Sequence, residues 1–178
     1  LPVVAGGAYN PAALTSLPGD PDVSSNHGTT VASDSATIGV SQSSTTTFSA
    51  NSVVNAVGEF TFSTIGWGYF DDSDVFQGTG AALGNSVTLA LNGTAGRSVK
   101  VEFVSPTDPD EKKVFLVNLV AGQQNYTFDI TGFGTVALIN FVSDEVGSTS
   151  YTVETKGLSY LPVVAGGAYN PAALTSLP

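Results

Sequence analysis

The sequence predicts an all-β fold, a β-sandwich or jelly roll with roughly eight or more antiparallel strands. Short runs of β-branched and aromatic residues alternate with polar residues over most of the chain. Turn signals such as Asn92-Gly93, Ala121-Gly122 and Gly132 to Gly134 separate these runs. No segment keeps the helical period of about 3.6 residues. Short strands with turns at this spacing are typical of sandwiches.

The expected strands follow one another from about residue 53 onward. In the clearest of them, Val99, Val101 and Phe103 alternate with Lys100 and Glu102, which indicates one buried and one exposed face. Residues 23–49 are rich in Ser and Thr, so we expect edge strands and loops there. The expected strand segments are 53–63, 65–69, 87–91, 99–103, 114–120, 126–130, 136–142 and 151–153.

The first eighteen residues recur without a mismatch as the last eighteen, at an offset of 160 residues. An identity of this length indicates one period of a tandem repeat followed by the start of the next. We therefore expect three parts: an extended apolar, Pro-rich linker at 1–18, a β-sandwich module at 19–160, and the linker of the next repeat at 161–178.

The repeated segment carries no charge, and its prolines favour an extended or turned backbone. A solvated interdomain linker is one interpretation, but such linkers are normally polar. Docking on a neighbouring copy of the module is the other, with strand addition as its mechanism. The residues expected to dock are Leu1, Val3, Val4, Ala5 and Tyr9 in the first copy, and Leu161, Val163, Val164, Ala165 and Tyr169 in the second.

Composition narrows the classes of partner. The chain has 5 Lys and Arg against 15 Asp and Glu, for a net charge of -10. A nucleic-acid partner is therefore not expected, because phosphate would be repelled. No stretch is long and apolar enough to insert into a membrane as a helix. The chain has no cysteine, so it has no disulfide framework and no thiolate site. The polar, sulfur-free composition fits an extracellular or cell-surface protein.

Three stretches carry a resemblance to known proteins: VTLALNGTAGRSVKVEFVSP (87–106), KKVFLVNLVAGQQNYTFDI (112–130) and VALINFVSDEVGSTSYTVETKGL (136–158). In their order of strands and turns they resemble the β-jelly-roll carbohydrate-binding modules of the galactose-binding-domain-like type. The resemblance implies a sandwich fold, a non-catalytic role and glycans as a class of partner. It does not extend to the repeated segment.

Trp67 and Tyr69 are the candidate sugar-binding residues. Sugars stack their apolar faces on exposed aromatic rings, and the jelly-roll resemblance implies such a platform. Ile65, Trp67 and Tyr69 share one parity of an expected strand, however, and that parity is equally the pattern of a core face. The sequence leaves both interpretations open.

Asp71, Asp72 and Asp74 form the candidate metal site. Ca²⁺ binds several carboxylate and carbonyl oxygens, which closely spaced Asp residues on a loop can supply. A solvated acidic turn explains the same cluster. A structural calcium ion is therefore the one cofactor considered, and otherwise none is expected.

The sequence does not predict an enzyme. It carries no nucleophile-elbow, P-loop or dinucleotide motif. The leading hypothesis is a structural module of an extracellular tandem-repeat filament, stalk or adhesin, whose linkers dock on neighbouring copies of the module. The alternative is a non-catalytic carbohydrate-binding module that acts in a multivalent array.

Overall fold

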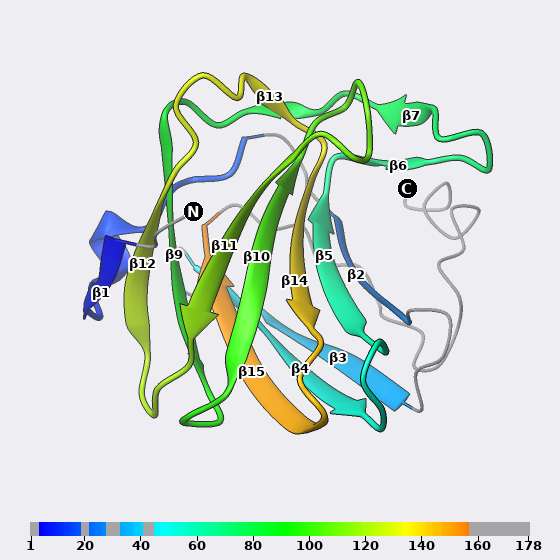
Figure 1. The fold of residues 1–178 in the computed structure, drawn as a ribbon. Helices are drawn as coiled ribbons and strands as arrows, with labels where there is room; N and C mark the ends of the chain where they lie inside the picture. The colour runs from blue at the N-terminus through cyan, green and yellow to red at the C-terminus, as the bar shows by residue number, and fades with distance from the viewer. Residues whose placement is uncertain (1–3, 19–21, 28–32, 41–44, 157–178) are drawn as a thin grey trace.

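Two antiparallel sheets packed face to face form the body of the protein (Figure 1). The computed structural model describes residues 4–18, 22–27, 33–40 and 45–156. These residues form fifteen strands and one short 3-10 helix, η1 (Pro11–Ala13). The predicted all-β sandwich is confirmed. Among the described residues, no helix has the length and hydropathy needed to cross a membrane.

The first sheet has six strands in the order β1-β12-β9-β15-β4-β3. Only neighbours in this order pair, and every pairing is antiparallel. Its outermost strands are therefore β1, from the N-terminal segment, and β3. The strands are β1 (Val4–Ala8), β12 (Gln124–Asp129), β9 (Ser86–Gly93), β15 (Gly147–Thr155), β4 (Thr46–Val54) and β3 (Ser33–Val40).

The second sheet has five strands in the order β11-β10-β14-β5-β2. They are β11 (Lys112–Asn118), β10 (Ser98–Val104), β14 (Leu138–Ser143), β5 (Thr61–Gly66) and β2 (Asp22–His27). Two small ribbons lie at one end of the sandwich (Figure 1): β8 (Ala81–Ala82) with β13 (Thr135–Val136), and β6 (Gly68–Phe70) with β7 (Phe76–Gly78).

Phenylalanine dominates the space between the sheets. Phe103, Phe115 and Phe128 are fully buried, and their ring centroids lie 5.3–5.8 Å apart. Phe48 and Phe141 meet edge to face at 5.6 Å. Edge-to-face and tilted rings at these distances are favourable, because they set the positive edge of one ring against the negative face of another. Strands from both sheets are thereby fixed to one core.

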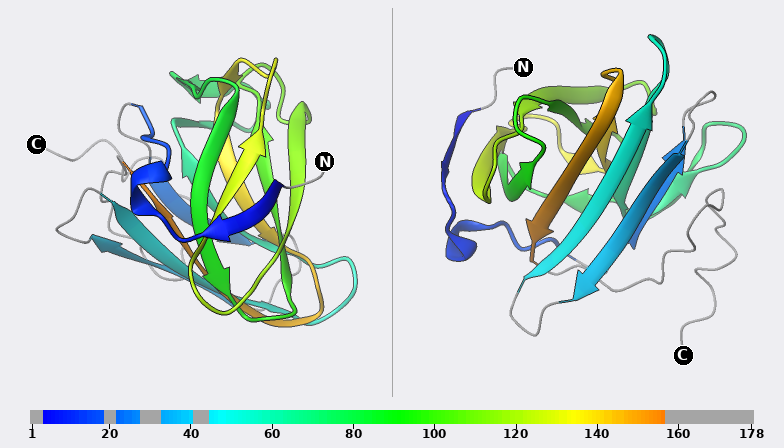
Figure 2. Two further views of the ribbon diagram at one scale, coloured as in Figure 1. Left: turned by 90° about the vertical axis from the view of Figure 1, so that its left-hand side faces the viewer. Right: turned by 90° about the horizontal axis from the view of Figure 1, so that it is seen from below.

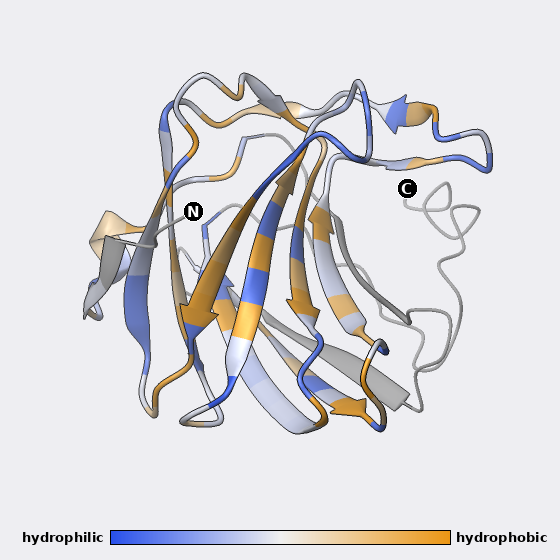
Figure 3. Cartoon of the chain, in the orientation of Figure 1, coloured by the Kyte–Doolittle hydropathy of each residue, from blue (hydrophilic) through white to orange (hydrophobic). Residues whose placement is uncertain are grey.

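Alternation along the strands separates this core from the outer faces. On β10, Val99, Val101 and Phe103 are buried, whereas Lys100 and Glu102 are only partly covered. Figure 3 shows the resulting bands of hydrophobic and hydrophilic residues along β10 and β14. Lys100 and Glu102 therefore lie on the outer face of the five-stranded sheet, where they become part of a candidate site.

Candidate functional site

The N-terminal segment lies on the sandwich of its own chain. Strand β1 pairs antiparallel with β12, with Val4 opposite Thr127 and Ala8 opposite Gln124. In Figure 2, β1 (dark blue) runs along the outside of the body, at the edge of the six-stranded sheet. We call residues 4–18 the docking segment. Leu1, Val3, Leu161, Val163, Val164, Ala165 and Tyr169 lie outside the described residues, so docking on a neighbouring copy stays a prediction.

Asn10 and Asn125 hold the docking segment to the outer face of the six-stranded sheet. Asn125 Oδ1 accepts from the Asn10 N–H at 3.2 Å, and Asn125 Nδ2 donates to the Asn10 carbonyl at 2.8 Å. One side chain thus satisfies both main-chain groups of Asn10. Asn125 is buried although it points outward from β12, because the docking segment covers it.

Tyr9 extends this contact to β15. Its hydroxyl donates a hydrogen bond to Glu154, whose other carboxylate oxygen accepts from Thr47. The hydrogen bond to the carboxylate, with smaller contributions from burial and from the negative charge of Glu154, raises the pKa of Tyr9 to about 12. A charged neighbour that accepts the proton's hydrogen bond disfavours the phenolate. Tyr9 is therefore protonated and neutral when the docking segment is bound.

Residues 15–17 insert between β9 and β15, where those two strands no longer pair. The Thr15 N–H donates to the Thr88 carbonyl at 2.9 Å, and the Thr88 N–H donates to Thr15 Oγ1 at 2.8 Å. On the other side, the Leu17 N–H donates to the Lys156 carbonyl at 3.0 Å, and Ser16 forms a parallel bridge with Lys156. The segment thus covers the outer face of the sheet, and its residues 15–17 also add main-chain hydrogen bonds to the sheet itself.

The same segment contributes apolar side chains to the interior. Leu14 and Leu17 are each only 4 % exposed, and Leu17 belongs to the main core cluster. Trp67 Nε1 donates to the Pro18 carbonyl at 2.7 Å. Burial of a leucine side chain contributes about 1.5–3 kcal/mol. We call the residues of the body that contact the docking segment its seat. These contacts combine main-chain hydrogen bonds with buried leucines, so the docking segment is an integral part of the fold.

The prediction of Trp67 as a sugar platform is wrong. Trp67 is only 7 % exposed and belongs to the core cluster, so it presents no open ring face for a sugar to stack on. The core alternative describes it, because Trp67 follows the last residue of β5 and keeps the inward parity of Ile65. Tyr69 lies half-buried in the middle of β6. The two residues form no common platform.

The acidic cluster forms the turn between β6 and β7. Asp71 Oδ1 accepts from the N–H groups of Ser73 and Val75, at 2.9 and 3.0 Å, and Asp71 Oδ2 accepts from Gln77 Nε2. These bonds, led by that from Val75, lower the pKa of Asp71. Within the described residues, no group of three or more acidic or histidine side chains converges on a metal site. The calcium hypothesis for Asp71, Asp72 and Asp74 stays a prediction without geometric support.

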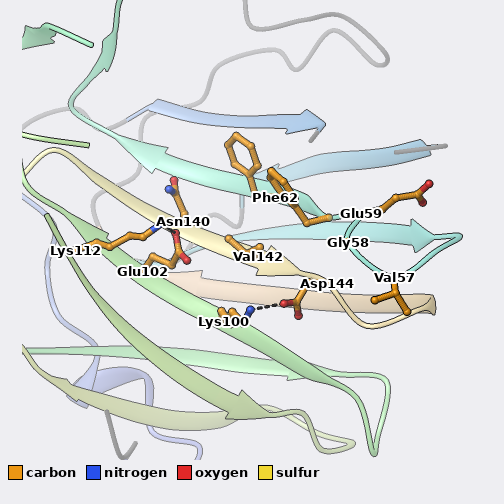
Figure 4. A pocket seen from close by; sticks show the side chains of 11 residues that line it. Val57, Gly58, Glu59, Phe62, Lys100, Glu102, Lys112, Asn140, Val142 and Asp144 are labelled. Atoms are coloured by element: carbon orange, nitrogen blue, oxygen red, sulfur yellow. Dashed lines mark hydrogen bonds and ion pairs between the residues drawn. The ribbon is translucent and has the colours of Figure 1, made fainter. Parts of the chain in front are cut away.

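A groove of about 530 Å³ runs over the outer face of the five-stranded sheet. Figure 4 shows its floor, where side chains from β10, β14 and β5 lie side by side. The register places Lys100 opposite Val142 and Val142 opposite Phe62, with Glu102 opposite Asn140 one step further along. Its lining residues are Val57, Gly58, Glu59, Phe60, Phe62, Lys100, Glu102, Lys112, Asn140, Val142 and Asp144.

Two aromatic rings form the apolar part of this groove. Phe60 and Phe62 stack with centroids 6.3 Å apart and planes inclined by 22°. Phe60 is 38 % exposed, an unusual position for a large apolar side chain, and Phe62 is half-buried. The pair therefore presents aromatic surface to solvent next to charged groups.

Paired charges form the polar part. Lys100 pairs with Asp144, and Lys112 pairs with Glu102 at 3.4 Å. Asn140 Oδ1 accepts from Thr64 Oγ1 at 2.8 Å. The groove thus offers hydrogen-bond donors and acceptors side by side with no large net charge. The sequence pattern predicts strands at Phe60, Phe62, Lys100 and Glu102 but no site; Phe60 itself lies just before β5.

Comparisons with known proteins give similarities of fold only. No family model matches the chain, and no curated protein matches it. A mutant of a family 29 carbohydrate-binding module is 13% identical, with a TM-score of 0.49 over 87% of this chain and 92% of that one. A family 29 module complexed with mannohexaose is 10% identical, with a TM-score of 0.46 over 79% and 95%.

A further solved structure is the enzymatically active domain of tailspike protein 4 from bacteriophage CBA120. It is 15% identical, with a TM-score of 0.39, and the match covers 77% of this chain but 19% of the tailspike domain. Because every one of these TM-scores lies below 0.5, we draw nothing about this chain's ligand or activity from them.

Proposed function

We propose that the chain is a non-catalytic carbohydrate-binding module and that the groove over the five-stranded sheet is its site. The observation that carries this proposal is the exposed Phe60–Phe62 pair beside two ion pairs in one groove. Pyranose rings combine apolar C–H faces with hydroxyl groups that both donate and accept hydrogen bonds. An aromatic surface flanked by donors and acceptors matches that combination.

The charges of the groove favour a neutral ligand. Lys100 and Lys112 each face a carboxylate, so neither cation is left to attract an anionic ligand. The overall charge of -10 also opposes anionic polymers. A cationic ligand would compete with the two lysines for Asp144 and Glu102. Neutral glycans therefore suit the site better than acidic polysaccharides or nucleic acid.

A glycan array followed by calorimetry tests the proposal. We expect Phe62→Ala to weaken binding of the selected glycan at least tenfold, which is about 1.4 kcal/mol. Leu116→Ala is the matched control, because Leu116 is exposed on β11 of the same sheet but does not line the groove. The absence of a glycan signal for the unmodified chain would reject the proposal, as would equal affinities of the two variants.

A second candidate function is structural: a unit of an extracellular tandem-repeat filament, stalk or adhesin. The exact repeat of the first eighteen residues favours it, together with the seat that the docking segment occupies on the body. An array of this kind would also multiply weak glycan sites along one chain. Electron microscopy of the native material tests it, because a fibre with a regular axial repeat supports this role and isolated particles reject it.

A further inference from the structure

The docking segment has an identical second copy in the same chain. Residues 161–178 reproduce residues 1–18 without a substitution, whereas the body offers one seat for this sequence among the described residues. We propose that residues 161–178 bind this seat on the body of their own chain, in place of the docking segment. The inference goes beyond glycan binding and is independent of it.

Every contact that holds the docking segment has a counterpart in the second copy. Asn170 stands where Asn10 does, and Thr175 where Thr15 does. Leu174, Leu177 and Pro178 correspond to the two buried leucines and to the carbonyl that accepts from Trp67. The partners on the body (Asn125, Thr88, Lys156 and Trp67) are not part of the repeated sequence. The seat therefore cannot distinguish the two copies by contact.

The second copy starts close enough to reach the seat. Lys156 is bridged to Ser16, the preceding residue Thr15 is hydrogen-bonded to Thr88, and Thr88 and Val4 both lie beside Thr127. The path from Lys156 to the position of Val4 thus crosses four strand spacings, about 19 Å. The eight residues from Lys156 to Val164 span up to about 26–29 Å. The chain from Lys156 is therefore long enough for residue 164 to take the place of Val4.

The covalent link between the second copy and the body favours binding within one chain over binding to a second chain. Exchange of one copy for the other leaves the number and kind of contacts unchanged, so a second chain would gain no contact to offset its association. A segment attached eight residues from the seat acts instead at the high effective concentration of a short linker. The two copies of the segment in one chain thus share the seat, and the sheet edge of the body stays covered when either copy is drawn away.

Engineered cysteines test the exchange in the full chain, which has no cysteine of its own. Ala8→Cys with Gln124→Cys joins Cα partners of the β1–β12 register and serves as the positive reference. Ala168→Cys with Gln124→Cys is the test pair. Gly167→Cys with Gln124→Cys is its control, since a shift of one residue turns the side chain to the other face.

We expect the test pair to form a disulfide within monomers at a yield well above that of the control, as read by gel filtration and peptide mapping. A yield no higher than the control would overturn the proposal. A disulfide found only in dimers would also overturn it, because the occupant would then come from a second chain.

Charge substitutions in the full chain give an independent test. Leu14→Asp with Leu17→Asp disables the first copy, and Leu174→Asp with Leu177→Asp disables the second. We expect either pair alone to change the Tm by less than about 2 °C, and all four together to lower it by more than about 10 °C. If the first pair alone lowers the Tm as far as all four do, the second copy does not replace the first. Glycan binding by the groove is a separate readout in each case.

Discussion

Asn125 is the residue whose substitution tests the seat of the docking segment most directly. It belongs to the body, and its two hydrogen bonds go to main-chain groups of Asn10. Either copy of the segment, when bound in the seat, would therefore depend on Asn125 for these two hydrogen bonds. We predict that Asn125→Ala destabilises the protein whichever copy of the segment is docked.

The expected loss follows from the two bonds. A typical intramolecular hydrogen bond contributes about 0.5–1.5 kcal/mol net, so two of them contribute about 1–3 kcal/mol. Asn10 is itself exposed, and water can replace part of what its main chain loses. We therefore expect a loss of about 1–2 kcal/mol in the free energy of unfolding, which lowers the Tm of a chain of this size by about 2–8 °C.

Urea unfolding measures this loss, followed by far-UV circular dichroism and by the fluorescence of Trp67, the only tryptophan. Trp67 bonds to Pro18, so its emission also responds to the end of the docking segment. Asn118→Ala is the control, because Asn118 is an exposed asparagine at the end of β11. If Asn125→Ala unfolds with the same free energy as this control, the Asn10–Asn125 contact does not hold the segment.

Three further predictions follow from single side chains. Because the pKa of Tyr9 is raised to about 12, its contribution to docking is complete below the ordinary tyrosine pKa of 10.0 and is lost as the pH rises through 12. In an ultraviolet titration, the Tyr9→Phe variant should show one fewer late-titrating tyrosine than the unmodified chain. Because the pKa of Asp71 is lowered, the β6–β7 turn is most stable above the ordinary aspartate pKa of 3.8 and loosens as the pH falls through the lower folded value. NMR shifts of the Ser73 and Val75 amides should report this loosening, and the pH dependence should disappear in Asp71→Asn. Trp67→Ala should cost about 3–5 kcal/mol of stability, measured by urea unfolding, since the ring is buried in the core.

Local pattern sufficed for most of the sandwich. Strands β9, β10, β12 and β15 lie where alternating apolar residues predicted them, because each has one face on the core. The apolar run 114–120 also predicted a strand, which the structure places at β11, two residues earlier at each end. Turn glycines also matched their expected role: Gly122, with a φ of +89°, lies between β11 and β12 in a conformation that a side chain disfavours. The strand pattern is weaker over residues 22–54, where β2 and β3 form the outermost strands of their sheets and β4 is rich in Ser, Thr and Asn.

The candidate sites were harder to predict, for a physical reason. The alternation of apolar and polar residues shows which side chains share a face of a strand but not which face is buried. From this pattern alone, Trp67 and Phe62 are equally compatible with the core and with an exposed site. Trp67 follows β5 directly and points inward, whereas Phe62 lies on the opposite parity of β5 and points outward. Val4 pairs within β1, but its partner strand is β12 of the same chain, so strand addition to a neighbouring copy stays a prediction. The choice of partner strand depends on tertiary contacts that no local pattern encodes.

The contacts of the docking segment give a physical reason for a second copy of its sequence. Without β1, the edge of β12 would expose the unpaired N–H and C=O groups of a strand. Without residues 15–17, the carbonyls of Thr88 and Lys156 would lose the main-chain donors that they accept from. An open edge of this kind pairs readily with another chain. In a tandem array the nearest competing edge belongs to an identical neighbour at high local concentration, which is the situation that favours misassembly of repeats. If both copies bind the seat as proposed, one of them closes the edge before a neighbour can pair with it. A variant that carries all four Leu→Asp substitutions should therefore aggregate faster than either pair alone, as light scattering would show.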